Sequence, residues 1–386
     1  MIPQQLPKLP RFYTIGTEET INVIDSMQRG LSGYLGGVDR AGYWVERLSE
    51  TWKDVFHGCL YVTPCNSATS GLLVACMAAE VGPGDTVWVP TYTMSATAAC
   101  AKVLGAKVRF VDIEEEFLGI NPMGLLAVKD RPKAVIVVNL LGHPAQLASI
   151  RGWCDANDVV MIEDNAQAPL AQEHNQYTGT IGHIGVFSLN VHKHIQCGEG
   201  GVITTGVADL GARIKALINH AELHPGFEGK LAGLNLRMTE PVAAIAVAQV
   251  RRAKALVAGR VAIAQQLTEM VRDFPFLIPP QVRTRCIHSY YVWAPQMKDG
   301  YSRDRFVMLL SSLGFPIRPG YSTPLHRIFP SDDLCPTADK VEDRIMSYEV
   351  CAYDPSDYHL KHMRDILHWA AEQVTSMNTE VLYLTK

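Results

Sequence analysis

The stretch 186–201 reads VFSLNVHKHIQCGEGG and lies between two apolar runs of beta-forming residues. It carries one lysine, Lys193, on a short polar loop, and glycines follow at 198, 200 and 201 before the next apolar run at 202–205. Glycines let a backbone bend closely around a bound group. An amine that loses solvent in such a loop has a lowered pKa and can attack a carbonyl. The alternative is a solvated loop lysine, because lysine is rarely buried without a partner.

Short apolar runs rich in beta-branched residues alternate with helical patterns through the first half of the chain. They lie at 60–63, 86–90, 107–112, 134–139, 159–164, 185–190 and 202–205. This alternation is typical of a mainly parallel sheet covered by helices. The sequence therefore predicts an α/β fold with seven candidate strands.

The pattern changes after residue 240. Residues 240–274 carry Ala, Val and Leu at helical spacing and predict one or two long helices. The remainder predicts a strand at 288–295 and helices at 303–313 and 337–347. We therefore predict a large domain over 1–255 and a smaller C-terminal α/β domain over 256–386.

The composition is that of a soluble globular enzyme. The net charge of the 386 residues is −4, and the 35 Lys and Arg form no long basic run, so nucleic-acid binding is not expected. The nine cysteines contain no Cys-x-x-Cys pair and are expected to be reduced thiols of a cytoplasmic protein. No apolar segment reaches the ~18–20 residues needed to span a bilayer, and no signal peptide is expected.

The apolar run at 159–164 ends in acidic residues, which puts Asp164 at the carboxyl end of a predicted strand. Open α/β sheets place ligand groups at this edge. A buried carboxylate needs a cation, and a protonated pyridine nitrogen would serve and would keep the ring an electron sink. Gln167 follows three residues later and can hold an oxygen of the same ring. The alternative is that Asp164 caps a helix, since Asp-x-x-Gln is a loose capping box.

Small polar residues at 63–71 lie between a strand and a helix start. Backbone amides and the Thr69 hydroxyl at the positive end of a helix dipole can cradle a phosphate. Ser188 can add a hydroxyl to the same group. The same residues can equally be an ordinary helix cap.

Polar residues also precede the long helix after 240. Asn235 and Arg237 stand in the loop before it, where they can reach a ligand or a neighbouring subunit, although Arg237 can equally form a structural salt bridge. His192 and His194 flank Lys193 at i, i+2, on opposite sides of an extended segment, without a carboxylate or Cys partner at ligand spacing. No metal site is predicted.

Several spaced motifs appear in one order along the chain. They lie at 67–69, 87–93, 104–113, 163–168, 187–201 and 235–240. Together they resemble the DegT/DnrJ/EryC/StrS family of pyridoxal-phosphate sugar aminotransferases. The resemblance is strong over about residues 30–250 and weaker at 318–326.

The resemblance implies a fold-type I transferase, with a seven-stranded large domain, a small C-terminal domain and a homodimer with shared sites. It implies pyridoxal 5'-phosphate (PLP) as the cofactor, with Lys193 as the Schiff-base lysine. Asp164 matches the partner of the pyridine nitrogen, and Gln167 the residue at the phenolic oxygen. The phosphate contacts match Ala68, Thr69, Ser188 and, from the opposite subunit, Asn235. Met94 stands where an aromatic ring usually stacks on the cofactor, and Tyr92 is the other residue that can reach over it.

Members of the family pass an amino group from an amino acid, usually glutamate or glutamine, to a keto-sugar that is often nucleotide-linked. The side chains expected to recognise the substrate are His183, His192, His194, Arg237, Arg318, Tyr321 and His326.

Three other functions fit the sequence less well. A PLP-dependent sugar dehydratase of the same fold is disfavoured, because those relatives carry His at the lysine position. A non-catalytic PLP-binding regulatory protein is disfavoured by the presence of Lys193, Asp164 and Gln167 together. A nucleotide-binding oxidoreductase lacks its glycine fingerprint.

Overall fold

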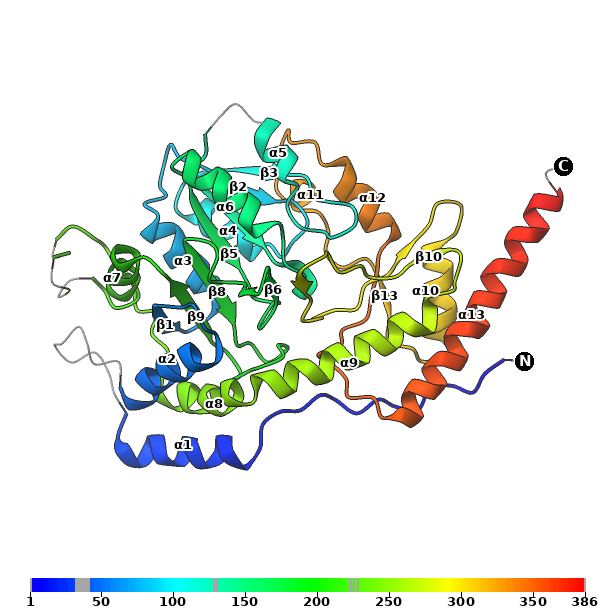
Figure 1. Ribbon diagram of the computed structural model, residues 1–386, viewed down its shortest axis with the longest axis horizontal. Coiled ribbons are helices and arrows are strands. Elements are labelled where there is room, and N and C mark those ends of the chain that lie inside the picture. The colour runs from blue at the N-terminus through cyan, green and yellow to red at the C-terminus, as the bar shows by residue number, and fades with distance from the viewer. Residues whose placement is uncertain are drawn as a thin grey trace.

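Seven strands form one sheet with helices packed around it (Figure 1), and most of the strand residues are buried. A computed structural model describes residues 2–31, 42–127, 131–221, 224, 226, 227 and 229–384. All five residues of β4 (Ala134–Val138) are buried, as expected for a central strand with helices on both sides. The other six strands are β1 (Tyr61–Cys65), β2 (Thr86–Pro90), β3 (Lys107–Val111), β5 (Val160–Asp164), β8 (Ile184–Ser188) and β9 (Gly201–Thr205).

The strand order is β1-β9-β8-β5-β4-β2-β3. Strand β9 runs antiparallel to both of its neighbours, and the remaining pairs are parallel. The carboxyl ends of β8, β5, β4, β2 and β3 therefore meet at one edge of the sheet. The predicted fold class, an α/β fold with a seven-stranded mainly parallel sheet, is confirmed.

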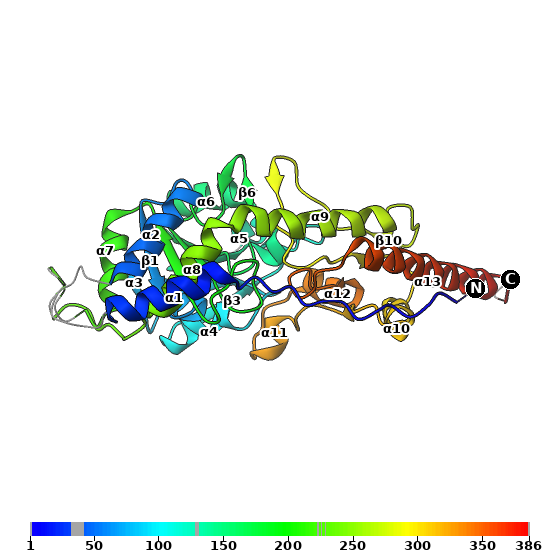
Figure 2. The same cartoon turned by 90° about the horizontal axis from the view of Figure 1, so that it is seen from below.

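Alternate residues of the strands enter two separate cores, one on each face of the sheet. Ile136 and Val138 pack on one face against α3 (Ala68–Ala78), α4 (Ala96–Val103) and α7 (Ala208–Leu217). Val135 and Val137 pack on the other face against α6 (Leu147–Ala156). That second face is continued by α2 (Tyr43–Val55) and α8 (Glu240–Arg251). Helix α1 (Thr17–Arg29) lies outside α8, at the edge of the molecule (Figures 1 and 2).

The long helix α9 (Ala253–Val271) leads from the sheet toward the C-terminal part (Figure 2). There, a separate core unites α9 with α10 (Arg303–Ser312) and α13 (Asp357–Leu384). Leu6 and Leu9 belong to this core, so the N-terminal segment packs with C-terminal residues. The boundary at residue 255 stays a prediction.

Short strands and helices complete the structure. They are β10 (Leu277–Ile278) with β12 (Gln296–Met297), β13 (Arg318–Pro319) with β14 (Met346–Ser347), β11 (Cys286–Ile287) with β6 (Gln172–Glu173) and β7 (Gln176–Tyr177), and the helices α11 (Leu325–Ile328) and α12 (Pro336–Arg344). Near the sheet lie α5 (Pro122–Ala127) and the 3-10 turn Leu140–Gly142.

The strand predicted over 288–295 is wrong. Tyr290 has a φ of +52°, which is incompatible with a continuous strand. The N–H groups of Ser289 and Tyr291 donate to Gly142 and Leu141 instead of to a neighbouring strand. This segment therefore anchors the loop that follows β4.

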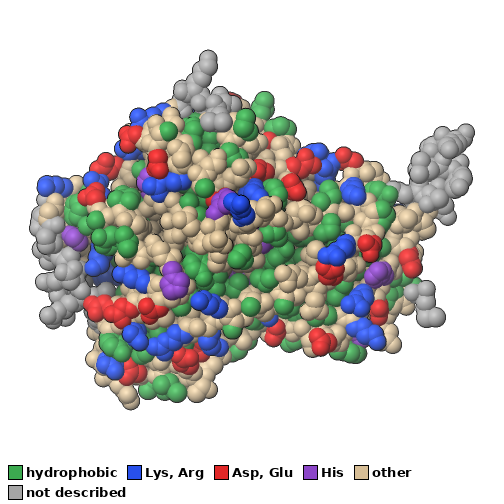
Figure 3. Space-filling view, in the orientation of Figure 1, with side chains coloured by type: hydrophobic (Ala, Val, Ile, Leu, Met, Phe, Trp, Pro, Cys, Tyr) green, Lys and Arg blue, Asp and Glu red, His purple; other side chains and the backbone are tan. Residues whose placement is uncertain are grey.

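Acidic and basic side chains alternate over the face shown in Figure 3, in keeping with the small net charge. Among the described helices, none combines the length and the apolar character that crossing a membrane would require.

Candidate active site

Asp164 ends β5 at the edge where the parallel strands terminate. Its side chain is buried, and its two oxygens are held by neutral donors. Oδ2 accepts a hydrogen bond from Thr97 Oγ1 at 2.9 Å, and Oδ1 accepts one from Ala166 N–H at 3.1 Å. Burial raises the pKa of Asp164, while these hydrogen bonds and the positive charge of Lys193 act in the opposite direction. A ligand cation placed here would relieve the cost of burying the carboxylate.

Lys193 faces the same region from the loop after β8. Its Nζ lies 4.2 Å from the centre of the Tyr291 ring. Burial lowers the pKa of Lys193 to about 8, and the negative charges of Asp164 and Glu349 limit the decrease. With this pKa, about a tenth of the amine is neutral at pH 7 and about half at pH 8, and the neutral form is the one that attacks a carbonyl. Lys193 is partly buried, so it is not the fully solvated loop lysine of the alternative interpretation.

Gln167 is held at both ends of its amide. Its Oε1 accepts a hydrogen bond from Leu141 N–H at 2.7 Å, and its Nε2 donates to the hydroxyl of Tyr321. Burial raises the pKa of Tyr321 to about 12, so this hydroxyl stays neutral. Gln167 is thus fixed in one orientation next to Asp164.

A chain of hydrogen bonds supports Tyr321 from behind. The Tyr321 N–H donates to the hydroxyl of Tyr92 at 3.2 Å, and that hydroxyl donates to Glu342 Oε2 at 2.5 Å. Tyr92 is fully buried in this arrangement, whereas 62% of Met94 is exposed. Of the two side chains considered for packing on the cofactor ring, Met94 is the accessible one.

The first turn of α3 lies beside Ser188 and Gly201. Gly201 pairs with Ser188 across β8 and β9, and a Cβ at position 201 would lie 2.7 Å from Ala68 N. Glycine is therefore required where β9 passes the start of α3. Ser67 Oγ caps Ser70 N–H, and Thr69 is exposed at the helix start, where backbone amides lack partners within the helix. These groups can bind a phosphate.

Four further predicted residues lie in defined places around the site. Asn235 is exposed and forms an isolated bridge with Asn219, whose Oδ1 also accepts a hydrogen bond from Arg237 at 2.5 Å. Arg318 is ion-paired with Glu349 at 2.7 Å. His326 Nδ1 lies 2.7 Å from Thr91 Oγ1.

The structure does not bring His183, His192 and His194 together at the site. His183 directly precedes β8, at the end of the strand opposite to Lys193. Its Nε2 lies 3.2 Å from Asp155 Oδ1. His192 is exposed. His194 is fully buried with its Nε2 at 2.9 Å from the carbonyl of Ser289, and burial lowers its pKa to about 4. The segment turns after Asn190, whose carbonyl accepts from Lys193 N–H, so the extended geometry assumed for this stretch does not form.

Sequence reasoning missed Thr97, Tyr291 and Glu349. Thr97 lies in the first turn of α4, and only the fold brings its hydroxyl to Asp164. Tyr291 and Glu349 come from the C-terminal part and carry no local pattern that marks them.

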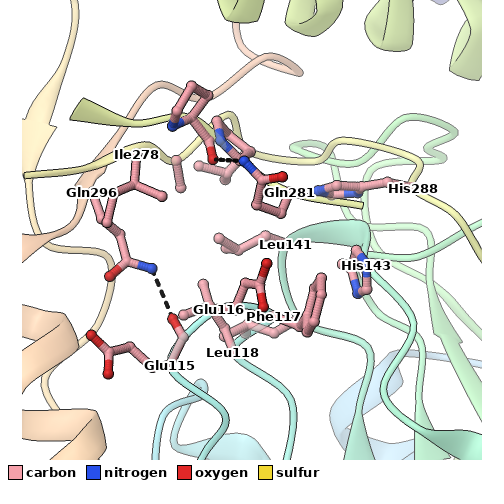
Figure 4. A pocket seen from close by; sticks show the side chains of 15 residues that line it. Glu115, Glu116, Phe117, Leu118, Leu141, His143, Ile278, Gln281, His288 and Gln296 are labelled. Carbon is pink, nitrogen blue, oxygen red and sulfur yellow. Dashed lines mark hydrogen bonds between the residues drawn. The ribbon is translucent and has the colours of Figure 1, made fainter. Parts of the chain in front are cut away.

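A cavity of about 500 Å³ adjoins this site (Figure 4). Leu141 forms part of its wall, and the N–H of the same residue holds Gln167. His143 also lines it, and burial lowers the pKa of His143 to about 4. Lys193 and Asp164, both within the described residues, are not part of its lining. The cavity is therefore a neighbour of the site and separated from it by the Leu140–Gly142 turn.

Known proteins are similar to this chain in sequence and in fold. The model of the DegT/DnrJ/EryC1/StrS aminotransferase family matches residues 36–353. The chain belongs to this family. A UDP-N-acetyl-3-dehydro-alpha-D-glucosamine 3-aminotransferase from Acidithiobacillus ferrooxidans is 30% identical over 296 residues, covering 75% of this chain and 79% of the relative.

Two other similarities extend over more of the chain. An L-glutamine:2-deoxy-scyllo-inosose aminotransferase from Streptoalloteichus tenebrarius is 28% identical, over 87% of this chain and 88% of the relative. The solved structure of an aminotransferase from Psychrobacter cryohalolentis superposes with a TM-score of 0.86 at 23% identity, over 96% of this chain and 100% of that one. The second similarity shows the shared fold.

The family depends on PLP, and the residues present fit that cofactor. A buried carboxyl held only by neutral hydrogen bonds suits a protonated ring nitrogen. A half-buried amine with a lowered pKa suits an aldehyde carbon. The start of α3, which lies in close contact with Gly201, suits a phosphate.

The lowered pKa of Lys193 predicts a pH dependence. Only the neutral amine reacts with a carbonyl, so reductive methylation of Lys193 in cofactor-free protein should increase with pH and reach half its maximum near pH 8. In the urea-unfolded chain the midpoint should lie near the ordinary value of about 10.4. Peptide mass spectrometry after labelling measures both. A midpoint near 10 in the folded protein would contradict this electrostatic account of Lys193.

Proposed function

We propose that this aminotransferase moves an amino group from an amino acid to a keto-sugar, with Lys193 as the catalytic residue. The observation that carries the proposal is the convergence of Lys193, Asp164 and Gln167 at one edge of the sheet. The relatives support the acceptor class, since one acts on a UDP-linked 3-dehydro amino sugar and another on a 2-deoxy-scyllo-inosose. Glutamate or glutamine is the proposed donor, and a nucleotide-linked sugar the proposed acceptor.

When bound, PLP supplies an electron sink for the carbon that loses a proton. Asp164 would pair with its ring nitrogen and Gln167 with its phenolic oxygen. Ala68, Thr69 and Ser188 would bind the phosphate, and Met94 would cover the ring face. Lys193 would hold the cofactor and, once its amine is released, accept and return the proton at Nζ. Its pKa of about 8 suits both directions of this transfer.

The test of this assignment is Lys193→Ala. The variant should keep the fold, measured by circular dichroism, and lose the visible absorbance of the protein-bound cofactor and its bleaching by L-glutamate, because the amine proposed to hold the aldehyde is removed. Lys254→Ala, which changes an exposed lysine on α9, is the matched control and should keep both. An unchanged spectrum in Lys193→Ala would refute the assignment.

We also propose that the protein works as a homodimer, in which Asn235 reaches the partner's cofactor phosphate. Helix α1 supports this, because some of its polar side chains are buried while several of its apolar side chains are exposed. Glu19, Asn22 and Ser26 are buried against the protein, while Ile21 and Ile24 are 58% and 52% exposed. Met27, also exposed, lies on the same helix. Apolar residues repeated at this spacing on one surface helix are typical of an interface.

Ile24→Asp should therefore shift the protein toward monomer. The residue is half exposed in one chain, and a symmetric interface contains it twice, so the dissociation constant should rise by at least about tenfold. Light scattering coupled to size exclusion over a dilution series measures this. Met308→Asp, at an exposed apolar residue of α10, is the control and should leave the assembly unchanged. Equal dissociation constants for the wild type and Ile24→Asp would exclude α1 from the interface.

The nine cysteines, all within the described residues, are free thiols, and this supports the proposed cytoplasmic location.

A further inference from the structure

An ion pair stands beside the proposed catalytic lysine. Arg318 on β13 contacts Glu349 Oε1 at 2.7 Å, and its Nε donates to Ser347 Oγ at 3.2 Å. The Ser347 hydroxyl in turn donates to the carbonyl of Gly320, which precedes Tyr321. Arg318 is therefore held by the short pair of strands β13 and β14, next to Tyr321, which contacts Gln167.

Both charges of the pair act on the groups that surround Lys193. Burial raises the pKa of Tyr291 and of Tyr321, and in both cases the positive charge of Arg318 opposes the increase while Glu349 adds to it. Glu349 also acts on Lys193 itself, where burial is the dominant influence. The ring of Tyr291 lies under the Lys193 nitrogen, so the ion pair acts on the ring that contacts this amine.

The pair is accessible and easily exchanged. The Arg318 side chain is 54% exposed and that of Glu349 36% exposed. Exposed ion pairs contribute little to stability, so another carboxylate can replace Glu349 at small cost. A guanidinium binds a carboxylate through two parallel hydrogen bonds, which a ligand free to orient itself can complete.

An amino donor always carries a carboxylate next to the amine that it gives up. We propose that Arg318 anchors a carboxylate of the amino donor, and that Glu349 occupies this anchor until the donor arrives. The displaced Glu349 carboxylate can then turn to the Lys193 amine that the donor releases, where it favours the protonated form. The inference rests on the proposed aminotransferase function, because that reaction requires an amino-acid donor.

The experiment measures the binding of glutarate, an unreactive dicarboxylate, to the PLP-loaded protein by calorimetry. Arg318→Gln should weaken glutarate binding by about ten- to hundredfold, since a charge-assisted pair is lost. Glu349→Gln should tighten glutarate binding several-fold, because the internal competitor is removed. Arg272→Gln, which breaks the exposed ion pair with Glu269 on α9, is the control and should bind like the wild type.

Unchanged glutarate affinity in Arg318→Gln would overturn the inference. The inference would also be overturned if Arg318→Gln lost affinity for UDP but bound glutarate normally, because Arg318 would then bind the phosphates of the acceptor. If Arg318→Gln does not fold, Glu349→Gln decides alone, and an affinity equal to or weaker than that of the wild type contradicts the inference. Absence of cofactor absorbance in the wild type would instead refute the proposed function, so the two failures are distinct.

Discussion

The burial of the Asp164 carboxyl is the constraint on which the rest of the site depends. A carboxylate removed from water is costly unless donors or a cation compensate it. Here, two neutral donors, Thr97 Oγ1 and Ala166 N–H, hold its oxygens, and among the described residues the positive charge of Lys193 favours its ionised form. A cationic ring nitrogen would complete this arrangement. The same burial lowers the pKa of Lys193, so one desolvated region prepares both the acid and the amine.

The sheet explains why these groups meet. Parallel strands bring the end of β5 and the loop after β8 to one edge, and β9 then returns antiparallel past the start of α3. That return requires glycine at 201, because a side chain would collide with the backbone at Ser67 and Ala68. The C-terminal part closes the site with Tyr321, Tyr291 and Glu349. Tyr291 and Tyr321 pack against the same core that α3, α4 and α7 form on the sheet, so closure of the site depends on contacts with the sheet core.

The sheet could be predicted from the sequence, and so could the part of the site that the sheet and its loops contribute. Strands with buried beta-branched residues are marked by local pattern, and the acid at the end of the run at 159–164 follows from that pattern. The lysine loop was recognisable from its glycines. Contacts made by distant segments were not predictable, which is why Thr97, Tyr291 and Glu349 were missed. The extended geometry expected around His194 does not form because the loop turns after Asn190, and the strand predicted at 288–295 is wrong because Tyr290 adopts a left-handed conformation.

The central claim is that the nitrogen of Lys193 carries the cofactor. The most direct measurement is borohydride reduction of the PLP-loaded protein followed by peptide mass spectrometry. We predict one cofactor per chain, attached to the peptide that contains Lys193. Attachment at a different lysine, or release of all the cofactor on denaturation after reduction, would contradict the account.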